Sequence, residues 1–263
     1  MVINRILKSK TTHSFLWLIG LLGFWEIASR CGWVPKYFLP PFSKVVENTF
    51  NEMIFGNLGL QTLNSLWVIL IGFIIAFVIA IVIAALGSAS ALFSTFFTTL
   101  STIFNPLPSV ALLPLIILWF GIDTKAMIVI IVHSVLWVMV RQLLDGINSI
   151  PKVYYEWSEN IELSHFRKFT NVLIMAILPE LISGIRIGWG RAWRSLISAE
   201  MVFGLIGSLG GLGYYIYNAR AYAHITDVMS GVVLIVIIGM FFESFLFAQL
   251  EKHTIKKWGM MHE

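Results

Sequence analysis

Residues Leu63–Leu86, with the sequence LNSLWVILIGFIIAFVIAIVIAAL, form an apolar run that contains no charged side chain. An α-helix rises about 1.5 Å per residue, so about 20 apolar residues cross a hydrocarbon core roughly 30 Å thick. This run meets that length. We therefore predict that it forms a helix that spans a membrane.

Other apolar runs of similar length lie before and after it. They are Ser14–Ser29, Ala89–Phe104 with an apolar continuation to Phe120, Lys125–Val140, Leu173–Phe203 and Val228–Leu250. The run from Ala89 is interrupted by Pro106, Pro108 and Pro114, and the run from Leu173 by Pro179 and three arginines. Proline in a helix interior removes a backbone hydrogen bond and bends the helix. The expected fold class is an all-α polytopic membrane protein with about six transmembrane helices.

The composition supports the same class, because 58% of the residues are hydrophobic, only 12% are charged, and the mean hydropathy is +0.84. Soluble domains carry about 25% charged residues. The single cysteine, Cys31, excludes an internal disulfide framework and a multi-cysteine metal site. Trp25 and Glu26 stand where a signal peptide would have small cleavage-site residues, so we expect the first run to remain as an anchor.

Lysine and arginine residues indicate the orientation, because they are in excess in cytoplasmic loops. Placing the N-terminus inside puts most of the loop Lys and Arg residues in the cytoplasm, among them Arg5, Lys8, Lys152, Lys256 and Lys257. With six spans, both termini are then expected inside. The expected domains are a cytoplasmic N-terminus (1–13), one transmembrane domain (14–258) and a C-terminal tail (259–263).

The apolar run stops before Arg141, and the following segment, from Arg141 to Thr170, has an amphipathic pattern. We expect this segment to form two surface helices on the cytoplasmic side. Ser149 is the expected N-cap of the first helix, with Pro151 in its first turn, and Ser164 is the expected N-cap of the second. A solvated connector is the alternative. Three aromatic side chains argue for a contact surface, since they need burial: Trp157, Phe166 and Phe169.

Three smaller features are predicted outside these helices. Phe42–Phe50 forms a short helix at the outer surface, and residues 87–90, Gly-Ser-Ala-Ser, form a tight cytoplasmic turn. Glu26 and Arg30 are spaced four residues apart and are expected to form a local ion pair.

The fifth apolar run, Leu173–Phe203, carries several charged side chains, and placing one charged side chain in a bilayer costs about 2.5–3.5 kcal/mol. Their presence therefore has to be explained. Arg186, Trp193 and Glu200 share one helical stripe, while Arg191 and Arg194 share another direction. One hypothesis is that Arg186, Trp193 and Glu200 line a translocation path and that the arginines attract an anion. The alternative is a set of structural ion pairs. Gly184 and Gly188 are expected to form a close-packing face.

Motifs for catalysis are missing from the sequence. It contains no phosphate-binding loop, no zinc-hydrolase motif and no nucleophile elbow, so we expect no ATP hydrolysis by this chain alone. His133 lies mid-span without a partner at helical spacing and is expected to be a hydrogen-bonded packing residue. We predict no metal site, no cofactor in this chain and no nucleic-acid partner.

Several short motifs follow one another in a fixed order. They are Trp25-Glu26-Ile27-Ala28, Phe38-Leu39-Pro40-Pro41, Pro108-Ser109-Val110-Ala111-Leu112-Leu113-Pro114-Leu115, Trp119-Phe120-Gly121-Ile122-Asp123, Gly184-Ile185-Arg186, Ala192-Trp193, Ala199-Glu200-Met201, Gly211-Leu212-Gly213-Tyr214, Thr226-Asp227 and Lys257-Trp258. Together they resemble the permease subunits of ATP-binding-cassette (ABC) importers of the nitrate, sulfonate, taurine and thiamine-precursor type. The resemblance covers nearly the whole chain.

That resemblance implies a five-helix core plus one helix, in the cytoplasmic membrane of a prokaryote. It also implies pairing with a second permease subunit, two copies of a cytoplasmic ATP-binding subunit that hold ATP and Mg, and an external substrate-binding protein. A non-transporting scaffold or sensor derived from a permease, or a secondary carrier, are the alternatives.

The family contacts its ATPase through a cytoplasmic loop, and the register of the resemblance places the glutamate of that loop at Glu156. The implied coupling residues are Glu156, Trp157, Ser158, Glu162, Leu163, Ser164, Phe166 and Phe169. The chain departs from the family pattern at Trp157 and Ser158, which replace two alanines, at Met175, which replaces a proline, and at Glu162, which replaces a glycine. A glutamate in a left-handed turn there costs on the order of 1 kcal/mol. Either the ATPase is matched to this loop, or the chain is one half of an unequal heterodimer.

Overall fold

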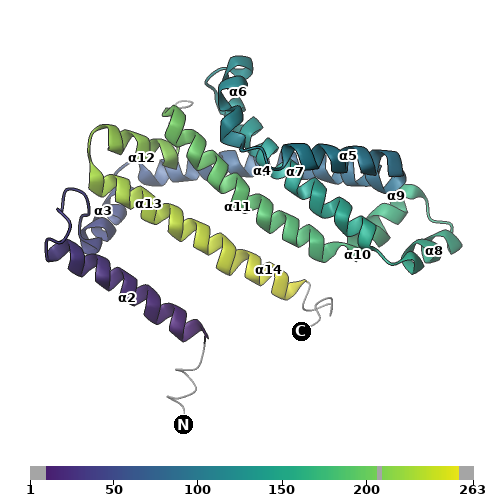
Figure 1. Cartoon of the computed structure of the whole chain (residues 1–263), viewed down its shortest axis with the longest axis horizontal. Helices are drawn as coiled ribbons and strands as arrows, with labels where there is room; N and C mark the ends of the chain where they lie inside the picture. The colour runs from purple at the N-terminus through teal and green to yellow at the C-terminus, as the bar shows by residue number, and fades with distance from the viewer. Residues whose placement is uncertain (1–9, 206–208, 255–263) are drawn as a thin grey trace, which may run out of the picture.

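The computed structural model describes residues 10–205 and 209–254, and every regular element within them is a helix (Figure 1). The long helices are α2 (Lys10–Arg30), α4 (Leu58–Ala89), α5 (Ala91–Phe104), α7 (Thr124–Ser149), α11 (Leu178–Phe203) and α13 (Ile225–Met240). The shorter ones are α3 (Phe42–Ile54), η1 (Ser109–Leu112), α6 (Leu113–Phe120), α8 (Lys152–Asn160), α9 (His165–Lys168), η2 (Phe169–Leu173), α10 (Ile174–Ala176), α12 (Leu212–Ala221), η3 (Phe241–Leu246) and α14 (Phe247–His253). The predicted all-α class is confirmed.

Three of these helices are long and apolar enough to cross a membrane: α4, α7 and the continuous helix Ile225–Lys252. Two bent pairs raise the number to five if each pair is one span. Helix α2 is not in this set, because His13, Glu26 and Arg30 make it less apolar. Residues 1–9 and 255–263 lie outside the described residues, and with them Arg5, Lys8, Lys256, Lys257, Trp258 and the predicted tail 259–263.

Helix α7 packs against both α4 and α11 and forms the main core of the bundle. Glycines allow the close approach on both sides. A Cβ atom on Gly72 in α4 would lie 2.7 Å from Cγ2 of Ile131, and one on Gly188 in α11 would lie 3.1 Å from Cγ1 of Val135. The close packing predicted at Gly188 is therefore confirmed. A Cβ atom on Gly184 would lie at an ordinary 3.5 Å from Cβ of Gln142, so the close approach does not depend on Gly184.

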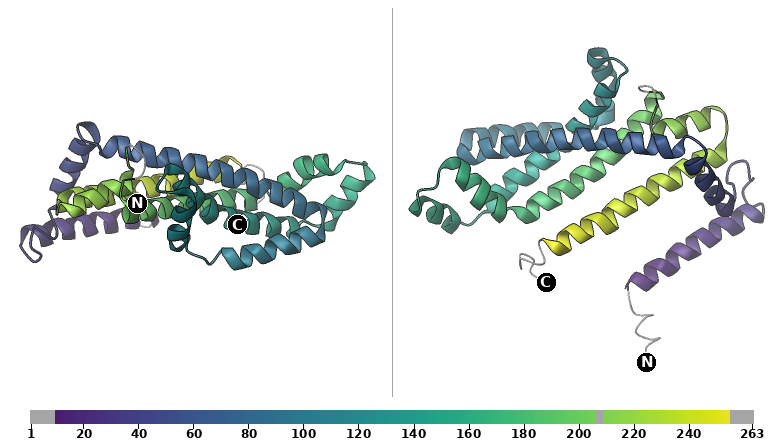
Figure 2. Two further views of the ribbon diagram at one scale, coloured as in Figure 1. Left: turned by 90° about the horizontal axis from the view of Figure 1, so that it is seen from above. Right: turned by 180° about the vertical axis from the view of Figure 1, so that it is seen from behind.

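Helix α2 stands apart from this bundle (Figure 2) and packs against α3 at its C-terminal end. There Trp25 Nε1 donates a hydrogen bond to the carbonyl oxygen of Pro40 at 3.0 Å. Nε of Arg30 lies 2.6 Å from Oε1 of Glu26, which confirms the predicted ion pair. The expected helix from Phe42 is also confirmed, and it extends to Ile54. One separate helix beside a bundle agrees with a five-helix core plus one.

The two predicted proline breaks are present as sharp bends. Helix α5 and the segment Ser109–Phe120 meet at 86°, and α6 consequently projects from the bundle (Figures 1 and 2). The segment His165–Ala176 meets α11 at 75°. The second break lies at Ile177, with Pro179 in the first turn of α11, so the fifth span begins at Leu178 rather than at Leu173.

Two local predictions were wrong. Helix α4 continues through Gly87 to Ala89, and Ser90 alone, in extended conformation, separates it from α5, so there is no four-residue turn. Helix α7 runs past Arg141 to Ser149, whose hydroxyl donates to the carbonyl oxygen of Gly146 at 2.7 Å instead of capping the next helix. Pro151 occupies the N-cap position of α8.

Candidate functional site

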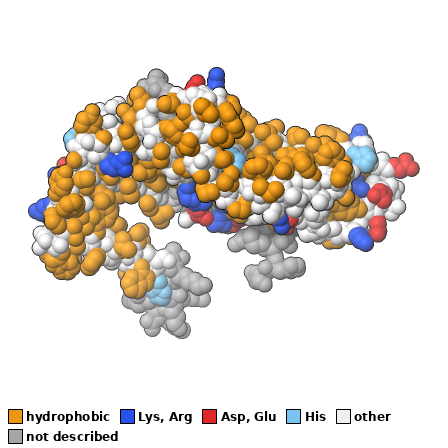
Figure 3. All heavy atoms as spheres, turned by 45° about the horizontal axis from the view of Figure 1, so that its top comes forward, with side chains coloured by type: hydrophobic (Ala, Val, Ile, Leu, Met, Phe, Trp, Pro, Cys, Tyr) orange, Lys and Arg blue, Asp and Glu red, His pale blue; other side chains and the backbone are white. Residues whose placement is uncertain are grey.

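Helices α8 and α9 form a hairpin at the end of the bundle opposite α3 and α12 (Figure 1). Apolar side chains cover most of the face drawn in Figure 3, whereas charged side chains gather at the end that carries this hairpin. Helix α4 runs from Leu58, near α3, toward the hairpin, and α7 ends where α8 begins. The hairpin therefore caps one end of the apolar bundle.

The turn between α8 and α9 contains a strained residue. Glu162 has a φ of 50°, the left-handed region that favours glycine. Its backbone N–H donates to the carbonyl oxygen of Glu159 at 2.9 Å, and the N–H of Leu163 donates to that of Ser158 at 3.1 Å. The left-handed conformation expected at Glu162 is confirmed. Ser164 also caps α9 as predicted, since its Oγ accepts from the N–H of Arg167 at 3.5 Å.

Lys168 holds the hairpin together from the inside. Its Nζ lies 3.1 Å from Oε1 of Glu159 and 4.9 Å from the centre of the Tyr155 ring. The Tyr155 hydroxyl donates to the carbonyl oxygen of Ile147 at 3.2 Å, which ties α8 to α7. Burial raises the pKa of the Tyr155 phenol, so the hydroxyl stays protonated as that donor. The hairpin thus has a defined shape rather than that of a loose connector.

The predicted coupling residues divide into two groups. The exposed group is Glu156, Trp157, Glu162, Ser164 and Phe166, with Leu163 half-buried beside it. Trp157 is 54% exposed and Phe166 is 76% exposed, so these aromatic rings find no cover within the described residues. Ser158 and Phe169 are buried and position the hairpin.

The charged stripe predicted on α11 is split among different environments. Arg186 pairs with Glu251 at 3.0 Å and with Glu243 at 3.2 Å, which links α11 to η3 and α14. Trp193 and Glu200 are buried inside this chain. The alternative of structural ion pairs therefore describes Arg186, while the role of these three residues in a path stays a prediction.

Glu200 joins three helices. Its carboxylate accepts a hydrogen bond from Ser65 Oγ in α4 at 2.9 Å and another from the backbone N–H of Gly213 in α12 at 2.8 Å. Ser65 Oγ in turn accepts from the backbone N–H of Leu212 at 2.9 Å. A side chain on Gly211 would overlap the Glu200 carboxylate, so the glycine keeps this contact possible.

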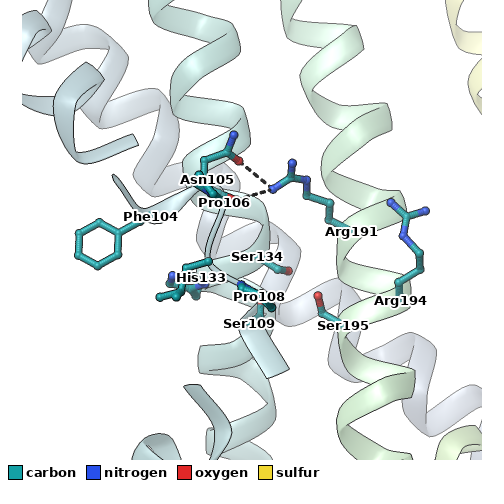
Figure 4. Close-up of a pocket in the computed structure, with 11 residues that line it drawn as sticks. Phe104, Asn105, Pro106, Pro108, Ser109, His133, Ser134, Arg191, Arg194 and Ser195 are labelled. Carbon is teal, nitrogen blue, oxygen red and sulfur yellow. Dashed lines mark hydrogen bonds between the residues drawn. The ribbon is translucent and has the colours of Figure 1, made fainter. Parts of the chain in front are cut away.

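The other two arginines of α11 line a cavity of about 290 Å³ beside the broken span (Figure 4). Arg191 Nη1 donates to Oδ1 of Asn105 at 2.8 Å. Arg194 is also among the lining residues, but its side chain turns back along α11, away from the Arg191 guanidinium, and His133 and Ser134 of α7 complete this part of the lining. No acidic residue lines this cavity, and in residues 10–205 and 209–254 no group of three or more His, Cys, Asp or Glu could hold a metal.

Comparison with known proteins decides the family. Residues 84–256 match the model of the binding-protein-dependent transport system inner membrane component family. The chain belongs to this family. It is therefore a permease of the ABC importer type.

Relatives of this permease extend the match to the N-terminal part of the chain. It is 32% identical to a putative aliphatic sulfonates transport permease protein of Escherichia coli strain K12, over 92% of this chain and 89% of that protein. It is 29% identical to a taurine transport system permease protein of the same strain, over 90% and 86%. It is 26% identical to a nitrate import permease protein of Synechocystis, over 79% and 78%.

Proposed function

We propose that this permease is the translocation subunit of an ATP-driven importer that moves a small, anionic or polar solute delivered by an external binding protein. The observation that carries the proposal is the ordered hairpin of α8 and α9, which presents Trp157 and Phe166 without cover at one end of the bundle. Aromatic side chains that are this exposed among charged neighbours on the hairpin, rather than on an apolar helix face that lipid covers, mark a surface that a partner covers. The relatives are described as permeases for aliphatic sulfonates, taurine and nitrate, which supports an anionic or zwitterionic solute.

The assembly that follows has this permease pairing with a second permease subunit, identical or different. Two cytoplasmic ATP-binding subunits bind ATP and Mg and dock on the hairpins. The hairpin end of the bundle then faces the cytoplasm, together with both termini, in a prokaryotic cytoplasmic membrane. Closure of the ATPases moves the hairpins and drives the exchange between outward and inward access.

The test is copurification of an ATP-binding subunit with the tagged permease, after extraction of the permease from its own membrane in detergent. Trp157→Ala and Glu156→Lys are expected to lower the amount of bound ATPase, because both residues are exposed on α8. Trp17→Ala is the matched control, since Trp17 is also exposed but lies on α2, far along the chain from the hairpin. Stable permease without ATPase, together with uptake that ignores ATP depletion, would instead support a scaffold or a secondary carrier.

A further inference from the structure

The cavity beside the broken third span holds positive charge without an acidic partner. In residues 10–205 and 209–254, neither Arg191 nor Arg194 lies within ion-pair distance of a carboxylate. Arg191 is half-buried, and Arg194 bends back so that its guanidinium lies over Gly190. Charges inside a bilayer are costly and mark ion or substrate sites when no protein partner neutralises them.

The backbone around this cavity also indicates an ion or substrate site. Residues 105–108, Asn-Pro-Leu-Pro, have irregular backbone and separate α5 from η1. Two of them are prolines, and the side-chain amide of Asn105 contacts Arg191. Irregular backbone at membrane depth is tolerated where it is buried in protein or lines a cavity. Asn105 also fixes the direction of the Arg191 guanidinium, which leaves further N–H groups of that side chain for a ligand (Figure 4).

His133 supplies a third polar group. Both of its ring nitrogens are buried and have no hydrogen-bond partner in the described part of the chain, which corrects the expectation of a hydrogen-bonded packing histidine. The ring stands edge-on to Phe104, with the ring centres 6.2 Å apart. A buried polar atom without a partner is costly, and a ligand in the cavity would supply one.

We propose that this cavity binds one small oxyanion at an intermediate binding site on the path through the permease. Arg191 and Arg194 hold the anion, and His133 forms a hydrogen bond with it. The inference rests on the proposed function and names its substrate class. Guanidinium groups bind sulfonate, carboxylate and similar groups through paired N–H donors. The volume of about 290 Å³ is small for a drug-sized ligand and suits a compact anion.

The experiment uses the permease in complex with its ATPase, in lipid nanodiscs and in a Tris–chloride buffer, whose dissolved anion is not an oxyanion. Saturation-transfer NMR measures binding of methanesulfonate, and dimethyl sulfone serves as its neutral isostere. Methanesulfonate is expected to bind saturably and dimethyl sulfone is not. Arg191→Gln and Arg194→Gln are each expected to weaken binding roughly tenfold or more, while Arg220→Gln, on α12 and outside the cavity, leaves it unchanged.

A chemical measurement on the unaltered protein guards against variants that fail to fold. Phenylglyoxal modifies exposed arginines, and peptide mass spectrometry follows Arg194. Methanesulfonate is expected to slow the modification of Arg194 but not that of Arg220. Equal binding of the sulfone, unchanged methanesulfonate affinity in both glutamine variants, or no protection of Arg194 would overturn the proposal. If one of these results is found while the ATPase still binds, only the anion site is rejected and the proposed function is retained. If the unaltered permease does not bind an ATPase, the proposed function is rejected as well.

Discussion

Ser65 donates a hydrogen bond to the carboxylate of Glu200 at 2.9 Å, although 135 positions separate them in the sequence. The contact connects the first half of α4 to the last turns of α11, and Glu200 adds the N-terminus of α12 through Gly213. Glu200 is only 5% exposed. Within one permease chain, this carboxylate therefore acts as a junction between helices.

Glu200→Ala is expected to lower the thermal unfolding midpoint of the permease in detergent. Alanine has no acceptor, so both the Ser65 hydroxyl and the Gly213 N–H lose the carboxylate as their partner. A buried unsatisfied group of this kind costs about 1–3 kcal/mol. Ser198→Ala is the matched control, because Ser198 lies on the same helix but is exposed. An unchanged midpoint for Glu200→Ala would contradict the junction.

Glu162→Gly is expected to stabilise the hairpin by on the order of 1 kcal/mol, because glycine adopts a positive φ without the steric cost that glutamate has. Hydrogen exchange of the amides in α8 and α9 measures the effect and should become slower. Asn160→Gly is the matched control two residues earlier, at the end of α8. Glycine there should speed exchange, since it weakens a helix. Faster exchange in both variants would show that the strain at Glu162 has no energetic consequence.

Lys168→Met is expected to loosen the hairpin while leaving α4, α7 and α11 unchanged. Methionine keeps an unbranched aliphatic chain of similar length but lacks the ammonium group that contacts Glu159 and Tyr155. Each contact is worth about 0.5–1 kcal/mol, so hydrogen exchange in α8 should rise severalfold. Lys152→Met, at the exposed start of α8, is the control. If both variants exchange alike, Lys168 does not organise the hairpin.

Features encoded by neighbouring residues were predictable from the sequence. The apolar runs, the proline breaks, the Ser164 cap and the Glu26–Arg30 pair all depend on composition or on spacings of a few positions. The end of α7 was missed for a related reason. Arg141 ended the apolar run, but it pairs with Asp145 at 2.6 Å one turn later on an exposed face. Leu143, Leu144 and Ile147 on the other face stay buried, so the helix continues.

Contacts between distant residues could not be predicted in this way. Helical spacing placed Arg186, Trp193 and Glu200 on one stripe, but it does not show which neighbour covers each part of that stripe. The partners of Arg186 and Glu200 lie 13 to 135 positions away in the sequence. The cavity needs the loop at Asn105 to fold back against Arg191, 86 positions later, and this also depends on the tertiary packing.

Arg186→Glu tests whether Arg186 stabilises the fold through its ion pairs or contributes its charge to the translocation path. The substitution places a third carboxylate beside Glu243 and Glu251, so α11 and α14 should separate and the unfolding midpoint should fall. Arg186 is about 39% exposed, and each pair contributes only about 0.5–1 kcal/mol. Adding Glu251→Arg restores an opposite charge at that position. If Arg186 is structural, the double variant regains both the midpoint and uptake. A regained midpoint without uptake would place the Arg186 charge in the path instead.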